Sequence, residues 1–158
     1  MNVKFLLGSI CILCMVCLMS GISLAENLGV PTQHGAVSWY ELMTTDVDAA
    51  AKFYTQLLGW ETEETKMTDG SKYVMIKVNG KPVGGMMKTP PQAQGVPPYW
   101  GLYVTVNDLD AAAKKVQELG GKILVPPTEI TDAAARFCVI QDPQGAVISL
   151  ITYQQKEQ

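Results

Sequence analysis

The sequence predicts an α+β protein in which two tandem βαβββ modules form a curled sheet around a cleft. Two observations predict this fold class. Residues 44–54 (TTDVDAAAKFY) and 106–116 (VNDLDAAAKKV) repeat one pattern at a spacing of 62 residues. The same order of strand-like and helix-like segments surrounds each copy. A self-match at a fixed spacing indicates a duplicated structural unit.

Each copy begins with a strand and a capped helix. Asp46 and Asp108 precede the helical repeats, where a carboxylate caps free N–H groups and complements the helix dipole. Glycine ends each helix, at Gly59 and at Gly120-Gly121. The strands that we expect before the helices are 37–43 and 102–106.

Three further strands are expected after each helix. Asp69-Gly70 and Asn79-Gly80 are hairpin-turn sequences, and Asp142-Pro143-Gln144-Gly145 favours a type I turn. These turns separate runs of β-branched and aromatic residues. The predicted strands are 60–66, 72–78 and 82–88 in the first copy, and 122–125, 136–140 and 146–152 in the second.

The N-terminal segment resembles a secretory signal peptide. Lys4 precedes an apolar run over 5–19, and Ser23-Leu24-Ala25 provides small residues for a signal peptidase. The run is short for a bilayer span of about 20 residues. We therefore expect export, to the periplasm or outside the cell, with a retained membrane anchor as the alternative. The expected segments are a signal peptide (1–25), an N-terminal tail (26–35), the first module (36–88), a Pro-rich linker (89–98), the second module (99–153) and a C-terminal tail (154–158).

Charge and cysteine content narrow the function classes. The formal net charge is −3, which argues against nucleic-acid binding because that function usually needs a basic face. Three of the four cysteines lie in the N-terminal apolar segment. Cleavage after Ala25 would leave Cys138 as the one cysteine of the mature chain, so no internal disulfide is expected.

The chain resembles the vicinal oxygen chelate superfamily, which includes glyoxalase I, bleomycin- and fosfomycin-resistance proteins and extradiol dioxygenases. Paired βαβββ modules, Phe53-Tyr54, Leu58-Gly59-Trp60 and Asp142-Pro143-Gln144-Gly145 carry the resemblance over about residues 35–153. It looks most like an uncharacterised branch. One departure is the loop before Arg136-Phe137, where relatives usually have a glycine.

The resemblance implies a divalent-metal site, and the residues do not supply one. Its members place His, Gln or Glu on the first and last strand of each module, where such side chains hold a metal with open positions. The matching positions here are Trp39, Gly84, Gly101 and Ser149. None of these is a useful ligand, so we expect no metal and no cofactor.

The same positions predict a small-molecule site. Strand alternation places Glu41 on the face of Trp39, Tyr103 on that of Gly101 and Met86 on that of Gly84. The candidate ligand-binding residues are Trp39, Glu41, Met86, Tyr103 and Ser149, a largely apolar set with few polar groups. The alternative is that these large side chains fill the barrel. Glu41 is the candidate general base, a ligand-binding carboxylate or a surface residue.

Three functions stay open at this point. The first is an exported, metal-independent protein that binds a small organic molecule between its modules. The second is a glyoxalase-type lyase, isomerase or dioxygenase with an atypical site, since fold alone does not assign function. The third is a non-catalytic protein-interaction module. The modules can also pair within one chain or exchange between two chains, which leaves a homodimer open.

Overall fold

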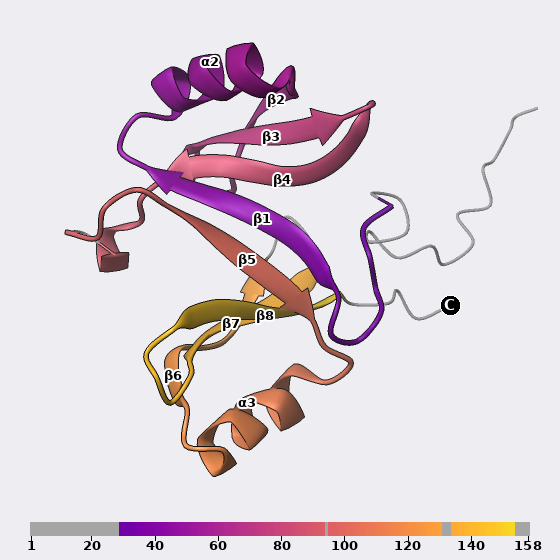
Figure 1. Ribbon diagram of the computed structural model, residues 1–158, viewed down its shortest axis with the longest axis vertical. Coiled ribbons are helices and arrows are strands. Elements are labelled where there is room, and N and C mark those ends of the chain that lie inside the picture. Colours follow the sequence, from indigo (N-terminus) through magenta and orange to yellow (C-terminus); the bar gives the residue numbers. More distant parts are fainter. Residues whose placement is uncertain (1–28, 94, 131–133, 154–158) are drawn as a thin grey trace, which may run out of the picture.

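The computed structural model describes residues 29–93, 95–130 and 134–153 and confirms the α+β class. Its strands form one curled, unclosed sheet with two helices outside it (Figure 1). The first module comprises β1 (Val37–Thr44), α2 (Val47–Leu58), β2 (Glu61–Lys66), β3 (Lys72–Val78) and β4 (Lys81–Lys88). A short 3₁₀ turn (Pro91–Ala93) leads to β5 (Tyr99–Thr105), α3 (Leu109–Glu118), β6 (Lys122–Ile130), β7 (Ala135–Gln141) and β8 (Val147–Tyr153).

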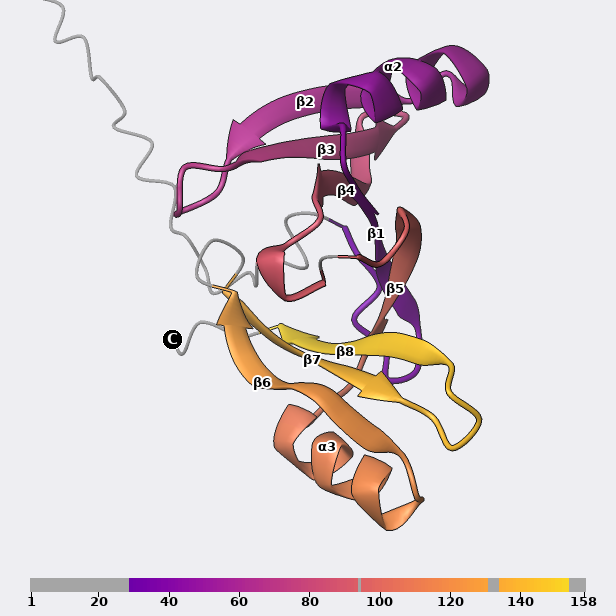
Figure 2. The same ribbon diagram turned by 90° about the vertical axis from the view of Figure 1, so that its left-hand side faces the viewer.

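The strand order explains how the two modules meet. The sheet runs β2-β3-β4-β1-β5-β8-β7-β6, and β1 pairs with β5 antiparallel at its centre. In each module the first strand is parallel to the last, β1 to β4 and β5 to β8. The modules therefore pair within this chain. Both helices lie on the convex side, so the opposite face of the sheet is concave (Figure 2).

Two predicted strand boundaries were wrong by more than one residue. β6 continues to Ile130 and not to Val125, through Pro126 and Pro127. Because β6 is an edge strand whose pairing with β7 skips from Val125 to Thr128, these prolines cost no ladder hydrogen bond. β5 begins at Tyr99, earlier than predicted, because it continues to pair with β1 there. Only the full pairing of the sheet fixes these ends.

The first aspartate of each repeated motif caps its helix. Asp46 Oδ1 accepts a hydrogen bond of 2.9 Å from the Ala49 amide, and Asp108 Oδ1 does the same for Ala111. Gly59 follows α2 in the left-handed conformation that favours glycine. The predicted helix starts are therefore confirmed.

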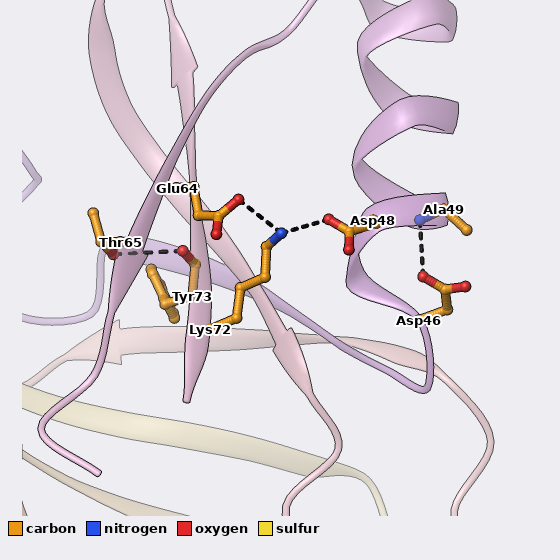
Figure 3. A network of polar contacts seen from close by, with 7 residues as sticks. All are labelled: Asp46, Asp48, Ala49, Glu64, Thr65, Lys72 and Tyr73. Carbon is orange, nitrogen blue, oxygen red and sulfur yellow. Dashed lines mark hydrogen bonds and ion pairs between the residues drawn. The ribbon is translucent and has the colours of Figure 1, made fainter. Parts of the chain in front are cut away.

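The second aspartate of each motif forms an ion pair with a basic side chain of the sheet. Asp48 lies 2.6 Å from Lys72 Nζ, which also lies 2.7 Å from Glu64 (Figure 3). In the second module Asp110 lies 2.7 Å from Arg136, which also contacts Glu129 at 3.1 Å. Each motif thus ties its helix to the convex face of its own half-sheet.

Hydrophobic clusters hold the helices on the sheet. The cluster under α2 contains Leu42, Val47, Val74, Ile76 and Met86, and the cluster under α3 contains Val106, Leu109, Ala113, Cys138 and Ile140. A third cluster, centred on Tyr103, Ala135 and Ile151, lies on the concave side of the second module. Among the described residues, neither helix has the length and apolar character needed to cross a membrane.

Candidate functional site

The central strands bring four of the predicted site residues together on the concave face. Trp39 pairs with Tyr103 across β1 and β5, and Tyr103 pairs with Ser149 across β5 and β8. Glu41 lies two residues from Trp39 on the same strand, so it shares that face. Glu41, Tyr103 and Ser149 are all buried. This arrangement puts a carboxyl group at the centre of the sheet.

Hydroxyl groups surround the Glu41 carboxyl. Tyr103 donates a hydrogen bond of 3.0 Å to Glu41 Oε2, and Tyr73 provides a second one. Trp39 Nε1 in turn donates to the Tyr73 hydroxyl at 3.1 Å. Only 7% of Glu41 is exposed, and none of the ion pairs between described residues includes it. The carboxyl is satisfied by neutral donors alone.

Burial governs the protonation of this network. Desolvation raises the pKa of Glu41 above its ordinary value of 4.5, and the hydrogen bonds from Tyr73 and Tyr103 oppose that shift. Burial also raises the pKa of Tyr103, as does the nearby Glu41 carboxylate, while a hydrogen bond from Ser149 lowers it. The pKa of Tyr73 is raised for the same two main reasons. Both tyrosines therefore stay protonated donors.

Tyr73 was missed in the sequence, and Gly85 explains why it fits. A Cβ atom on Gly85 would lie 1.9 Å from the Tyr73 hydroxyl oxygen and 2.2 Å from its ring carbon Cζ. Gly85 pairs with Glu41 across β4 and β1. The missing side chain is what lets the Tyr73 hydroxyl reach the carboxyl. The Gly84-Gly85 pair was the available clue in the sequence.

The placement of Met86 on this face was wrong. Met86 pairs with Leu42 and Val74, is fully buried, and belongs to the cluster under α2. A bulge causes the difference, since Lys77 pairs with Pro82 while the preceding Ile76 pairs with Gly84. The extra residue shifts every later side chain of β4 to the other face.

Gly84 was likewise assigned to the wrong face, and it leaves no space. A Cβ atom there would lie 2.4 Å from the Tyr40 carbonyl oxygen and 2.7 Å from its ring. Beneath α2, Tyr40 packs against Trp60 and Trp100, and Trp60 stacks on Tyr54, so the room beside Gly84 is filled. The concave position is Gly85, so Glu41 and Gly85 in the first module correspond to Tyr103 and Ser149 in the second.

The four corresponding positions of the concave face carry few donor groups for a divalent metal. With Gly85 in place of Gly84, the corresponding residues are Trp39, Gly85, Gly101 and Ser149, which offer one hydroxyl and no imidazole or carboxylate. In the described ranges, no group of three or more His, Cys, Asp or Glu side chains is placed to hold a metal ion. Glu41 is a single carboxyl within a set of tyrosine hydroxyls.

Three other conspicuous residues lie outside the site. His34, the one histidine of the sequence, accepts a hydrogen bond of 3.3 Å from the Asn107 amide. Cys138 is fully buried under α3. Arg136 is engaged by two carboxylates on the convex face. None of them reaches the Glu41 network.

Comparisons with known proteins agree with the fold. The model of the Glyoxalase/Bleomycin resistance protein/Dioxygenase superfamily matches residues 36–150. A Putative glyoxylase CFP32 of Mycobacterium bovis is 40% identical over 120 residues, which cover 75% of this chain and 46% of that protein. Anthracycline biosynthesis protein DauV of Streptomyces sp. (strain C5) is 30% identical over 128 residues, 73% of this chain and 46% of that protein. The chain thus spans about half the length of these curated relatives.

Solved structures show the same fold at low sequence identity. Methylmalonyl-CoA epimerase from Mycobacterium tuberculosis superposes with a TM-score of 0.57 at 20% identity, covering 78% of this chain and 93% of that one. A methylmalonyl-CoA epimerase in complex with methylmalonyl-CoA and NH4+ gives 0.57 at 18% identity, with 76% and 95% covered. At these identities the likeness concerns the fold alone.

Proposed function

Because the chain belongs to the glyoxalase/bleomycin resistance protein/dioxygenase superfamily, we propose that it binds a small organic molecule on its concave face without a divalent metal. The observation that carries the proposal is the buried Glu41 carboxyl, held by Tyr73 and Tyr103 and bordered by Trp39. A few fixed polar groups among aromatic side chains is the usual composition of a small-molecule site.

The metal-independent part of the proposal rests on the side chains of the concave face. Glu41 is the one carboxylate of the network, and its hydrogen bonds come from tyrosine hydroxyl groups. The glycines at 85 and 101 provide no donor atom. Recognition would therefore use hydrogen bonds and apolar contact.

We place this binding outside the cytoplasm. The support is the sequence of residues 1–25, which has the charged start, apolar run and small-residue site of a signal peptide. These residues lie outside the described part of the structure. Mass spectrometry of the protein purified from an exporting host tests this point, because cleavage after Ala25 gives an N-terminus at Glu26.

A ligand screen with matched variants tests the binding function. Small organic molecules are added to the protein, and a ligand is expected to raise the melting temperature, with about 2.7 kcal/mol of stabilisation at 100 times Kd. Glu41→Gln should lower that increment to about 1.4 kcal/mol or less, the value for binding that is at least about tenfold weaker. Glu118→Gln, at an exposed carboxyl on α3 paired with Lys115, should keep it. Ligands that stabilise both variants equally would exclude Glu41 from the site.

A proton-transfer enzyme is the second candidate, favoured by the raised pKa of the buried Glu41 carboxyl. A carboxylate of this kind can take a proton from a bound carbon acid, while the Tyr73 and Tyr103 hydroxyl groups hold its oxygen atoms in position. NMR of a bound ligand in D₂O distinguishes the two functions. Hydrogen exchange lost in Glu41→Gln supports the enzyme, whereas an unchanged ligand supports the binding protein.

A further inference from the structure

The two halves of the concave face are packed differently. In the second module a hydrophobic cluster of Tyr103, Ala135 and Ile151 covers this face, with Trp39 and Phe137 packed against it. The rings of Tyr103 and Phe137 lie 6.1 Å apart. Side chains of the protein itself occupy this half.

In the first module three methionines lie on the same face, beside Tyr73. Met43 pairs with Met87 across β1 and β4, and Met75 pairs with Gly85 across β3 and β4. Met43 lies on the same face of β1 as Glu41, and Met87 lies on the same face of β4 as Gly85. We call Met43, Met75 and Met87 the methionine wall.

The methionine wall is not part of a packed core. Its three side chains are half-buried, and they belong to none of the hydrophobic clusters found in the described residues. Met86, by contrast, is fully buried among the residues under α2. Thioethers are polarisable, adapt to irregular shapes and make favourable contacts with aromatic rings. A wall of such side chains without a core to fill suits a flat aromatic ligand.

The charged side chains near the methionine wall indicate the charge of that ligand. Glu41 borders the methionine wall and has only neutral hydrogen-bond donors. Lys77, which shares the face parity of Tyr73 and Met75, is held by Glu63. Lys72 and Arg136 are paired with acids on the convex side. A positive group on the ligand would complement the buried carboxyl, and a negative group would be opposed by it.

We propose that the ligand is a planar aromatic amine that lies against Met43, Met75 and Met87 and donates hydrogen bonds to Glu41. The inference rests on the proposed binding function and adds the location of the site and the class of its ligand. It assigns the site to the first module, although the two modules share one topology.

Tryptamine and indole-3-acetate are matched probes, because they share the indole ring and carry opposite charges. Protein labelled with ¹³C at the methionine methyl groups is titrated with each and followed by NMR. Tryptamine is expected to shift the methyl signals of Met43, Met75 and Met87 and to leave Met86 unmoved. Indole-3-acetate should bind at least about tenfold more weakly. Single Met→Leu variants assign the signals.

Variants separate the two contacts. Glu41→Gln should weaken tryptamine binding about tenfold and bring the two probes closer in affinity. Replacing the three wall methionines by leucine should weaken it severalfold, whereas Met86→Leu should not. Equal or tighter binding of indole-3-acetate, or no methyl shift with millimolar tryptamine, would overturn the inference.

The same signals distinguish this inference from the proposed function. A screen hit that binds in a Glu41-dependent manner but moves no wall methyl leaves the proposed function in place and overturns the assignment to the methionine wall. A complete absence of screen hits and of tryptamine binding overturns both.

Discussion

Replacing Gly85 by alanine should displace the Tyr73 hydroxyl from the buried carboxyl. The added Cβ atom would lie 1.9 Å from the Tyr73 hydroxyl oxygen, a separation that no real contact allows. The ring has to move because Gly85 lies in the middle of β4, paired with both Glu41 and Met75. Glu41 would then lose one of its two tyrosine donors.

The expected cost follows from two effects. Loss of a hydrogen bond to a buried charged group costs about 1–3 kcal/mol. Forcing an extra methyl group into a filled space costs about 1–3 kcal/mol. We therefore expect Gly85→Ala to lower the free energy of unfolding by about 2–6 kcal/mol, the sum of the two effects. Urea denaturation followed by tryptophan fluorescence measures this loss.

Gly101→Ala is the matched control on the other side of Glu41. A Cβ atom on Gly101 would have its nearest neighbours at 3.7 and 3.8 Å, which is ordinary contact. This variant should be neutral or stabilised by about 0.4–1 kcal/mol, since alanine restricts the unfolded chain. In a Tyr73→Ala background, Gly85→Ala should cost less than about 1 kcal/mol. Equal effects of the two alanines, or an unchanged cost without Tyr73, would show that the clash with Tyr73 is not the cause of the loss.

Three further predictions concern proton linkage, capping and metals. Because the pKa of Glu41 is raised in the folded protein, its contribution to stability is present below the ordinary value of 4.5 and is lost as pH rises through the folded value, by about 1.4 kcal/mol per pKa unit. Glu41→Gln should remove this loss of stability with rising pH. If urea denaturation of the variant showed the same pH dependence as the wild type, Glu41 would not be its source. Asp108→Ala should lower the free energy of unfolding by about 1 kcal/mol, because the cap of α3 is lost. Asp110→Ala should lower it less, because the ion pair between Asp110 and Arg136 is exposed. Thermal melts in which Asp110→Ala is the more destabilising variant would contradict this order. Zinc, nickel, manganese and ferrous ions should leave the melting temperature unchanged, and elemental analysis that found a stoichiometric metal would contradict the donor set described for the concave face.

Part of the candidate site could be predicted from strand alternation. Within one strand the side-chain period is fixed, so Trp39 and Glu41 had to share a face. The position of Ser149 after its turn was also counted correctly, because β8 pairs with β7 without a bulge. The same count placed Met86 on the wrong face, because the bulge near Pro82 adds one residue to β4. Strand alternation therefore predicts the face of a side chain only where no bulge interrupts the strand.

The helix caps and the hairpin turns could be predicted from sequence alone, because each depends on residues within a few positions of one another. Asp46, Asp108 and the Asn79-Gly80 turn are examples. The duplicated modules could be predicted because the same pattern returns after 62 residues. The contact of Tyr73 with Glu41 over Gly85, and the position of Met43, Met75 and Met87 outside the hydrophobic clusters, became known only from the tertiary structure. Those contacts join separate strands, and their register is set by hydrogen bonds across the sheet, which no local pattern specifies.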